Sequence, residues 1–180
     1  MSAVKNIQEK LGRIKLKKEQ KKLNRSVKSF NIENASTIGV IYNATNRTEA
    51  DTVKKFIQYL KEERKEVISL GFINSKESSD KATSMLNYLY FDQSDLSKTM
   101  VPSSSDVNTF INKPFSILID LNLTDCFPLE YVSSLSTAKF KVGASGGYRD
   151  SVCDMVINID NNNQLDYLII QIRHYLNMIN

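Results

Sequence analysis

The sequence predicts a doubly wound α/β sandwich, in which helices cover both faces of a mostly parallel sheet. Three observations support this fold class. Short, apolar, β-branched runs recur along the chain, as is typical of strands buried on both faces. Amphipathic helical patterns alternate with these runs, and that alternation favours parallel strands. The chain has 180 residues, 41% of them hydrophobic, which suffices for one sizeable core.

The first part of the predicted body contains two strands around one helix. Thr37–Tyr42 is short, β-branched and apolar, and therefore typical of a fully buried strand. Residues 48–65 are expected to form a helix, because their apolar side chains fall on one face and their charges on the other. Thr48 and Asp51 give a weak capping-box pattern at its start. Residues 67–73 are the second expected strand.

The middle of the chain adds two strands separated by polar segments. A short helix or turn is expected around residues 81–86, and residues 88–91 are a third strand. A long polar loop is expected over residues 92–106. The run FSILIDL at residues 115–121 is the strongest strand pattern in the chain, and a proline directly precedes it.

The last part completes the predicted sheet. A helix over about residues 128–137 begins with proline at its first position. Residues 140–142 form a short strand that ends in the glycine-rich segment 143–147. Another strand is expected at residues 155–159, and a final amphipathic helix at residues 164–179. We therefore expect a Rossmann-like three-layer sandwich of five or six strands, forming one domain over residues 37–180.

A basic segment precedes this body. Residues 1–30 carry ten Lys and Arg but only two Glu, a net charge of +8, whereas the remaining residues have a net charge of −4. The segment is rich in helix formers, so we expect a helical arm joined to the body by a linker over residues 31–36. Its apolar residues fall on two stripes that are out of phase, the first being Val4, Ile7, Leu11 and Ile14. Because neither stripe is broad, we expect much of the arm to project into solvent.

The basic arm carries the favoured functional hypothesis, a non-catalytic adaptor that docks on an anionic partner. Basic clusters attract phosphate backbones, anionic membranes and acidic protein surfaces. RNA or a ribonucleoprotein is favoured over a membrane, because the arm lacks the wide apolar face with aromatic residues that membrane helices prefer. A peripheral membrane protein held by the arm is a further alternative, and a solvated helix that only aids solubility is the non-functional interpretation. The candidate anion-binding residues are Lys10, Arg13, Lys15, Lys17, Lys18, Lys21, Lys22 and Arg25.

The carboxyl ends of the predicted strands offer an alternative site, since open α/β sheets bind ligands there. The polar residues expected at this edge are Asn43, Thr45, Asp92, Asp120, Asn122 and Ser145. Asp120 is the most notable of them, because a carboxylate in an apolar strand is costly unless it is paired. An enzyme or sensor for a small phosphorylated ligand is thus the alternative function. The same residue types are also common in turns, so a purely structural role is the other interpretation of these residues.

No reaction, cofactor or metal is indicated by the sequence. The segment Gly143–Gly147 lacks the spacing of a dinucleotide or P-loop fingerprint. The single histidine, His174, falls off the apolar stripe of its helix and is expected to be solvated. Cys126 and Cys153 are expected to be reduced thiols in a cytoplasmic protein, because no signal peptide, CxxC pair or membrane-spanning run accompanies them.

Four segments resemble an uncharacterised bacterial family, a domain of unknown function. They are Phe115–Leu121, Pro128–Tyr131, Ser136–Gly143 and the closing Ile170–Asn177. The resemblance spans most of the chain and implies a small cytoplasmic α/β protein with a basic N-terminal helix. It implies no activity and no site residues.

Overall fold

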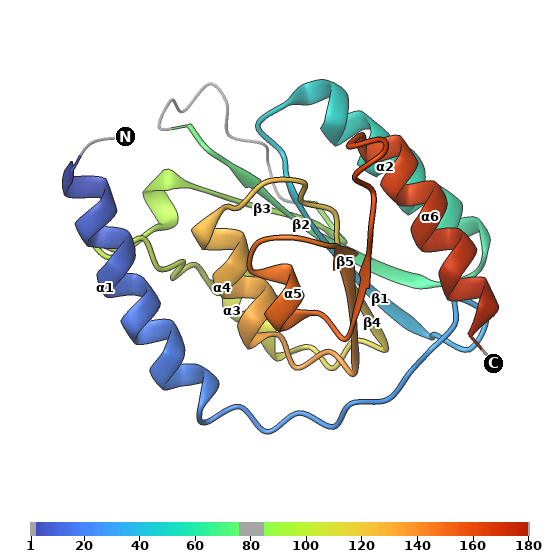
Figure 1. Ribbon diagram of the computed structural model, residues 1–180, viewed down its shortest axis with the longest axis horizontal. Coiled ribbons are helices and arrows are strands. Elements are labelled where there is room, and N and C mark those ends of the chain that lie inside the picture. The colour runs from blue at the N-terminus through green and yellow to red at the C-terminus, as the bar shows by residue number, and fades with distance from the viewer. Residues whose placement is uncertain (1–2, 76–84, 180) are drawn as a thin grey trace.

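The computed structural model describes residues 3–75 and 85–179, and its centre is a sheet of six parallel strands (Figure 1). The strands lie in the order β3-β2-β1-β4-β5-β6, so the direction of strand addition reverses between β1 and β4. Their bounds are β1 (Thr37–Asn43), β2 (Glu66–Ile73), β3 (Tyr88–Asp92), β4 (Ile117–Asp120), β5 (Phe140–Ala144) and β6 (Met155–Ile157). The predicted doubly wound α/β sandwich is confirmed.

Helices cover both faces of the sheet. α2 and α6 lie together on one face, whereas α3, α4 and α5 lie on the other (Figure 1). The helices are α1 (Ala3–Gln20), α2 (Arg47–Glu62), α3 (Ser105–Asn112), α4 (Phe127–Leu135), α5 (Arg149–Val152) and α6 (Leu165–Met178), with a short 3-10 helix η2 (Gln93–Asp95) after β3.

Alternation along the strands divides the apolar residues into two cores. Ile117 and Ile119 of β4 point to the α2/α6 face, and Leu118 between them points to the α3/α4 face. All three side chains are fully buried. By the same alternation, Asp120 falls on the α4 side at the carboxyl end of the strand, which places a carboxyl group where the sheet meets its loops.

Three local predictions differ from the structure. α3 begins at the end of the segment expected to be a polar loop, with Ser104 as its N-cap. α5 is a short helix between Gly147 and the strand expected at residues 155–159, where no helix was predicted. The cap of α2 is Asn46, whose side chain accepts hydrogen bonds from two backbone amides, rather than the predicted capping box of Thr48 and Asp51. The turn expected around residues 81–86 lies largely outside the described residues.

Candidate functional site

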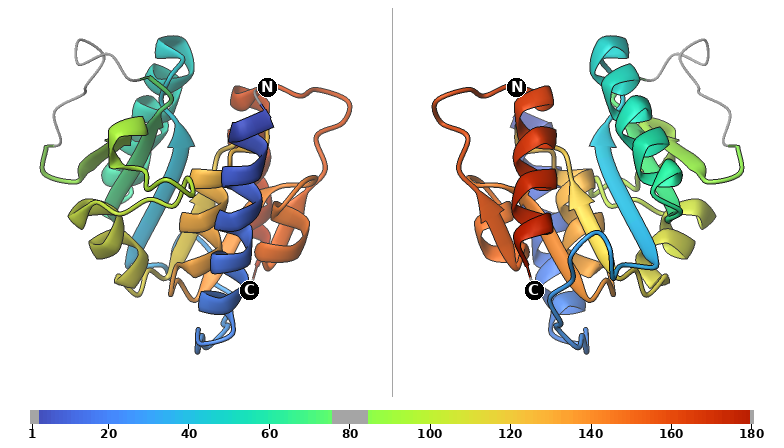
Figure 2. Two further views of the ribbon diagram at one scale, coloured as in Figure 1. Left: turned by 90° about the vertical axis from the view of Figure 1, so that its left-hand side faces the viewer. Right: turned by 90° about the vertical axis from the view of Figure 1, so that its right-hand side faces the viewer.

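The N-terminal helix α1 lies against the body instead of projecting from it, so the expectation of a projecting arm is wrong (Figure 2). Leu16 is only 2% exposed and joins the core on the α3/α4 face. Gly12 makes the contact close: a Cβ atom at this position would lie 2.2 Å from the carbonyl oxygen of Thr99 and 2.5 Å from the ring of Phe127. The absence of a side chain at residue 12 therefore lets the helix reach α4 and the loop before α3.

Arg13 ties α1 to α4. Its guanidinium donates to both carboxylate oxygens of Glu130, pairs with Glu9 at 2.9 Å, and lies 5.2 Å from the centre of the Phe127 ring. Burial raises the pKa of the Glu130 carboxyl, and the charge of Arg13 offsets part of that rise. Arg13, a predicted anion-binding residue, is thus engaged in an internal contact.

The chain after α1 also packs on the body. The helix ends at Gln20, before the end of the predicted helical segment, and residues 21–36 form neither helix nor strand. Arg25 forms an ion pair with Asp154 and donates to the carbonyl oxygen of Ala138 at 2.6 Å. Lys22 pairs with Glu19 at 3.1 Å on the surface. The expected linker contributes Ile32 to the core.

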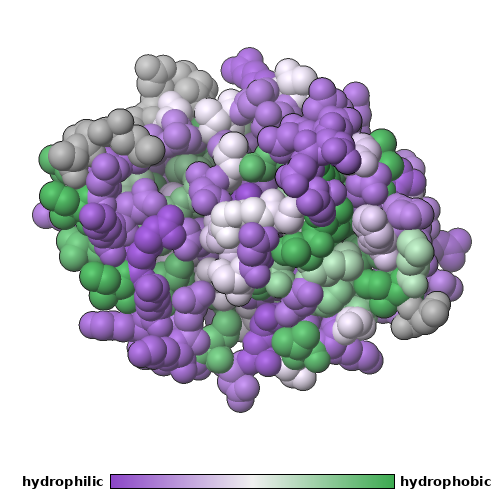
Figure 3. All heavy atoms as spheres, in the orientation of Figure 1, coloured by the Kyte–Doolittle hydropathy of each residue, from purple (hydrophilic) through white to green (hydrophobic). Residues whose placement is uncertain are grey.

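Four of the remaining predicted lysines lie on the part of the α1 surface that does not contact the body, and Lys21 directly follows the helix. They are all exposed, and none forms an ion pair with another residue in the described part of the chain: Lys10, Lys15, Lys17, Lys18 and Lys21. The same side bears the first apolar stripe, whose members are 50–62% exposed: Val4, Ile7, Leu11 and Ile14. We call these nine residues, including Lys21 directly after the helix, the outer face of α1. Apolar and hydrophilic atoms alternate along the left edge of Figure 3, which α1 forms.

At the other candidate site, the point between β1 and β4 where strand order reverses contains a small cavity of about 180 Å³. The predicted residues Asn43 and Asn122 both line it, with Tyr42 and Leu121 beside them and Glu49 from the first turn of α2. None of its ten lining residues, all within the described ranges, carries a positive charge. The cavity lies where ligands of this fold bind, but its lining offers no counter-charge to a phosphate.

Asp120 and Asn122 form a buried hydrogen-bonded cluster with Tyr148. The Tyr148 hydroxyl donates to one carboxyl oxygen of Asp120 at 2.8 Å. The backbone and side-chain amides of Asn122 donate to the other oxygen at 3.1 and 2.6 Å. Burial raises the pKa of the Asp120 carboxyl, and these hydrogen bonds oppose the rise. The cluster satisfies the carboxyl group and fixes the loop that follows β4.

The other predicted pocket residues do not join this cluster. The hydroxyl of Thr45 accepts from the backbone amide of Asn74 at 2.8 Å. Asp92 caps η2 after β3, two strands away from β1. Ser145 follows β5 and donates its backbone amide to Ile157. These three residues shape turns at the sheet edge rather than one shared pocket.

The structure shows the surroundings of the glycine-rich loop, the two cysteines and the histidine, for which no functional role was predicted. Asp150 accepts the backbone amide of Gly146 at 2.7 Å, so a carboxylate already occupies a donor of the glycine-rich loop. Burial raises the pKa of the Cys126 thiol to about 11 and also raises that of Cys153, which disfavours the reactive thiolate. His174 is exposed. No group of metal-ligating side chains occurs among residues 3–75 and 85–179.

Sequence reasoning missed three polar residues near Asp120. Tyr148 supplies the hydroxyl of the buried cluster. Arg149 is 3% exposed, and its guanidinium donates a hydrogen bond to the carbonyl oxygen of Ala144. Lys141 is 2% exposed and donates to the carbonyl oxygens of Ser133 and Ser134 at the end of α4. The available signal for Lys141 was a charged residue within an otherwise apolar strand pattern. A charged side chain can point from a strand into solvent only when one face of the sheet meets water, and helices cover both faces of this sheet.

Two substitutions of Asp120 test how much its hydrogen bonds stabilise the protein. Asp120→Ala should destabilise the protein by about 3 kcal/mol, because the donors of Tyr148 and Asn122 would be left buried without an acceptor. Asp120→Asn retains one carbonyl oxygen and should cost about 1 kcal/mol at neutral pH. Urea unfolding monitored by circular dichroism measures both values.

The same unfolding experiment has a pH signature. Because burial raises the folded-state pKa of Asp120, its stabilising contribution is complete below the unfolded-state pKa and is lost as the pH rises through the folded-state pKa. The penalty of Asp120→Asn should therefore be larger at pH 4 than at pH 7. A penalty that is constant or grows with pH would show that Asp120 is ionised in the folded protein at both values.

Comparison with known proteins identifies a family but no described relative. None of the helices in the described residues is both long enough and apolar enough to cross a membrane. No curated protein and no solved structure matches the chain. A family described as a family of unknown function (DUF6913) matches residues 8–179, which include α1 from residue 8 onward and all strands and helices of the α/β body. The chain therefore belongs to this family of unknown function.

Proposed function

We propose that this protein is a non-catalytic adaptor that docks the outer face of α1 on an anionic partner. The observation that carries the proposal is the division of the basic residues of the N-terminal segment into those bound to the body and those left exposed. Arg13 and Arg25 bind the body, whereas five lysines remain exposed without an ion pair in the described residues. These lysines concentrate positive charge on the outward surface of one docked helix, and such a cluster attracts anionic surfaces.

The docked position of α1 supports this role. A helix held by Gly12, Arg13 and Leu16 presents its outer lysines on a fixed backbone, so less backbone freedom is lost on binding than for a projecting arm. RNA and ribonucleoprotein surfaces, which the charge alone favours, would bind these lysines through phosphates and release counterions. Binding should therefore weaken steeply with added salt.

The cavity between β1 and β4 is the competing site, and it supports a function less well. Its volume of about 180 Å³ is below the roughly 300 Å³ at which drug-sized ligand pockets begin. A phosphorylated ligand would meet Glu49 there and no cationic side chain among the lining residues. We therefore place the function on α1.

Charge reversal on α1 tests the proposal without removing a packed segment. Deleting residues 1–30 would expose the body surface beneath Leu16, whereas Lys10→Glu with Lys17→Glu changes two exposed side chains. Binding to poly(U) RNA, phosphatidylglycerol vesicles and poly-glutamate is measured between 50 and 200 mM salt. We expect at least one of these polyanions to bind the native protein and to bind the variant about tenfold more weakly.

The matched control reverses two exposed lysines of α2, Lys54→Glu with Lys55→Glu, which produces the same net charge. This control should bind as the native protein does. An equal loss in both variants would mean that net charge alone drives binding, and failure of all three polyanions to bind would refute a docking role for the outer lysines.

A further inference from the structure

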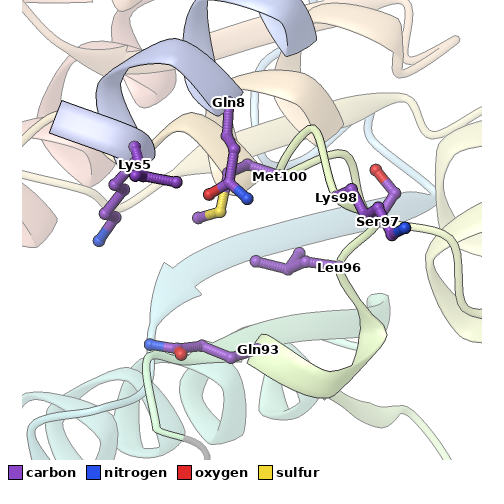
Figure 4. Close-up of a pocket in the computed structure, with 8 residues that line it drawn as sticks. Lys5, Gln8, Gln93, Leu96, Ser97, Lys98 and Met100 are labelled. Atoms are coloured by element: carbon purple, nitrogen blue, oxygen red, sulfur yellow. The ribbon is translucent and has the colours of Figure 1, made fainter. Parts of the chain in front are cut away.

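A groove of about 420 Å³ separates the first turns of α1 from the segment that follows β3 (Figure 4). Lys5 and Gln8 reach into it from α1, and Leu96 and Gln93 face them from the opposite side (Figure 4). Apolar side chains and hydrogen-bond donors line it together: Val4, Lys5, Gln8, Gln93, Leu96, Ser97, Lys98 and Met100. None of these eight described residues is acidic. The groove therefore combines apolar side chains with the positive charges of its two lysines.

The groove is continuous with the outer face of α1, because Val4 belongs to both. Val4 is 62% exposed and begins the aliphatic stripe that runs through Ile7 and Leu11 to Ile14. Spacings of three and four residues place these side chains in one row over about three helical turns, or roughly 15 Å. Spacings of this kind are the anchors by which one amphipathic helix recognises another surface.

We propose that the outer face of α1 and this groove bind an acidic amphipathic helix of a partner protein. The proposal rests on the adaptor function above and specifies its partner. Leucine or similar aliphatic side chains of the partner helix would cover the aliphatic stripe, whose residues are 50–62% exposed. Its carboxylates would meet the lysines that flank the stripe and the two that line the groove, Lys5 and Lys98.

Charge and side-chain type separate this occupant from three others. A second copy of the chain that packed symmetrically through this face would bring the same lysines against one another. RNA would satisfy the lysines but leave the aliphatic stripe in water, because bases stack on aromatic or guanidinium planes and the outer face has neither. A membrane favours a wide apolar face with aromatic residues, whereas the stripe is one residue wide with Lys18 next to it.

The test uses a labelled synthetic peptide of about 18 residues with leucine at heptad a and d positions and glutamate on the flanks. Its affinity for the full-length protein is measured by fluorescence anisotropy. We expect binding that weakens at least about tenfold in the variant Ile7→Ser with Leu11→Ser, because the two exposed side chains would no longer bury apolar area. A scrambled peptide of the same composition should bind at least about tenfold more weakly to the native protein.

The control variant is Ile170→Ser with Met178→Ser, which removes two side chains of α6 that are similarly exposed at 56% and 63%. Its affinity for the peptide should equal that of the native protein. Equal binding of the designed and scrambled peptides, or unchanged binding by Ile7→Ser with Leu11→Ser, would overturn the proposal. The proposal would also be overturned if the binding of phosphatidylglycerol vesicles or poly(U) depended on Ile7 and Leu11 while the binding of the peptide did not.

The two proposals fail separately. If Lys10→Glu with Lys17→Glu weakens binding to poly(U) or vesicles while the designed peptide does not bind, the adaptor function stands and the acidic helix is excluded. If none of the polyanions binds through these lysines, the adaptor proposal fails whatever the peptide does at the aliphatic stripe.

Discussion

Replacing Gly12 with alanine should release α1 from the body, although alanine favours helix formation by about 1 kcal/mol over glycine. The new Cβ atom would lie 2.2 Å from the carbonyl oxygen of Thr99, a backbone atom that cannot rotate away. It would also lie 2.5 Å from the Phe127 ring. The helix must move outward, and that movement separates Leu16 from the core and Arg13 from Glu130.

The strain of overpacking is comparable with the burial energy by which Leu16 holds α1 in place. Full burial of a leucine side chain contributes about 1.5–3 kcal/mol, and overpacking typically costs about 1–3 kcal/mol. Once undocked, an isolated lysine-rich helix of 18 residues is only marginally stable in water. The backbone amides of α1 should then exchange with deuterium at least about tenfold faster than in the native protein, while those of β1 and β4 keep their protection.

Hydrogen exchange followed by mass spectrometry measures this effect by segment, and Asn6→Ala is the matched control. Asn6 is exposed on the same helix, so alanine there raises helix propensity without a contact to the body. Exchange in α1 should be slowed or unchanged in this control. If Gly12→Ala protects α1 as Asn6→Ala does, the close approach of α1 to Thr99 and Phe127 does not hold the helix in place.

The α/β body was predictable because its strands carry a local signal. Residues such as those of β1 and β4 are buried on both faces, so an unbroken apolar run identifies them without knowledge of their neighbours. α3 was missed for the opposite reason. It has only eight residues, and its three buried side chains are too few for a clear helical period.

The orientation of α1 was not predictable from its hydrophobic pattern. The regular stripe from Val4 to Ile14 faces solvent, while a glycine, an arginine and a single leucine face the body. A glycine inside a helix-forming segment was the one local sign of a close approach. The charge count drew attention to this segment, but it could not separate the two arginines bound to the body from the exposed lysines, because the partners Glu130 and Asp154 are distant in sequence.

The candidate site at the strand ends was predictable by position but not by partnership. Asp120 stood out as a carboxyl group in an apolar strand. Its partner Tyr148 is 28 residues away and lies just before α5, a helix that the sequence did not indicate. Which polar groups satisfy a buried residue depends on tertiary packing, and the same limitation applies to Lys141.

Lys141 should make the native protein gain stability relative to Lys141→Met as the pH rises above 8. Burial lowers the pKa of its ammonium group to about 8, and the nearby charge of Arg25 lowers it further than Asp154 restores it. A lysine whose folded-state pKa is depressed contributes stability that is present above the unfolded-state pKa and lost as the pH falls through the folded-state value. The interval from about 8 to the ordinary value of 10.5 corresponds to roughly 3 kcal/mol.

Urea unfolding of both proteins at pH 7 and pH 9.5 measures this difference. Relative to Lys141→Met, the native protein should gain about 2 kcal/mol between these two values, because most of the proton release from the folded state occurs there. The titration of tyrosines and cysteines is common to both proteins and largely cancels in the difference. Lys139→Met, at an exposed position two residues earlier, controls for the general effect of removing a positive charge. A difference between the native protein and Lys141→Met that stays constant over this range would mean that the ammonium group keeps its water at the end of α4, in conflict with its 2% exposure and its hydrogen bonds to Ser133 and Ser134.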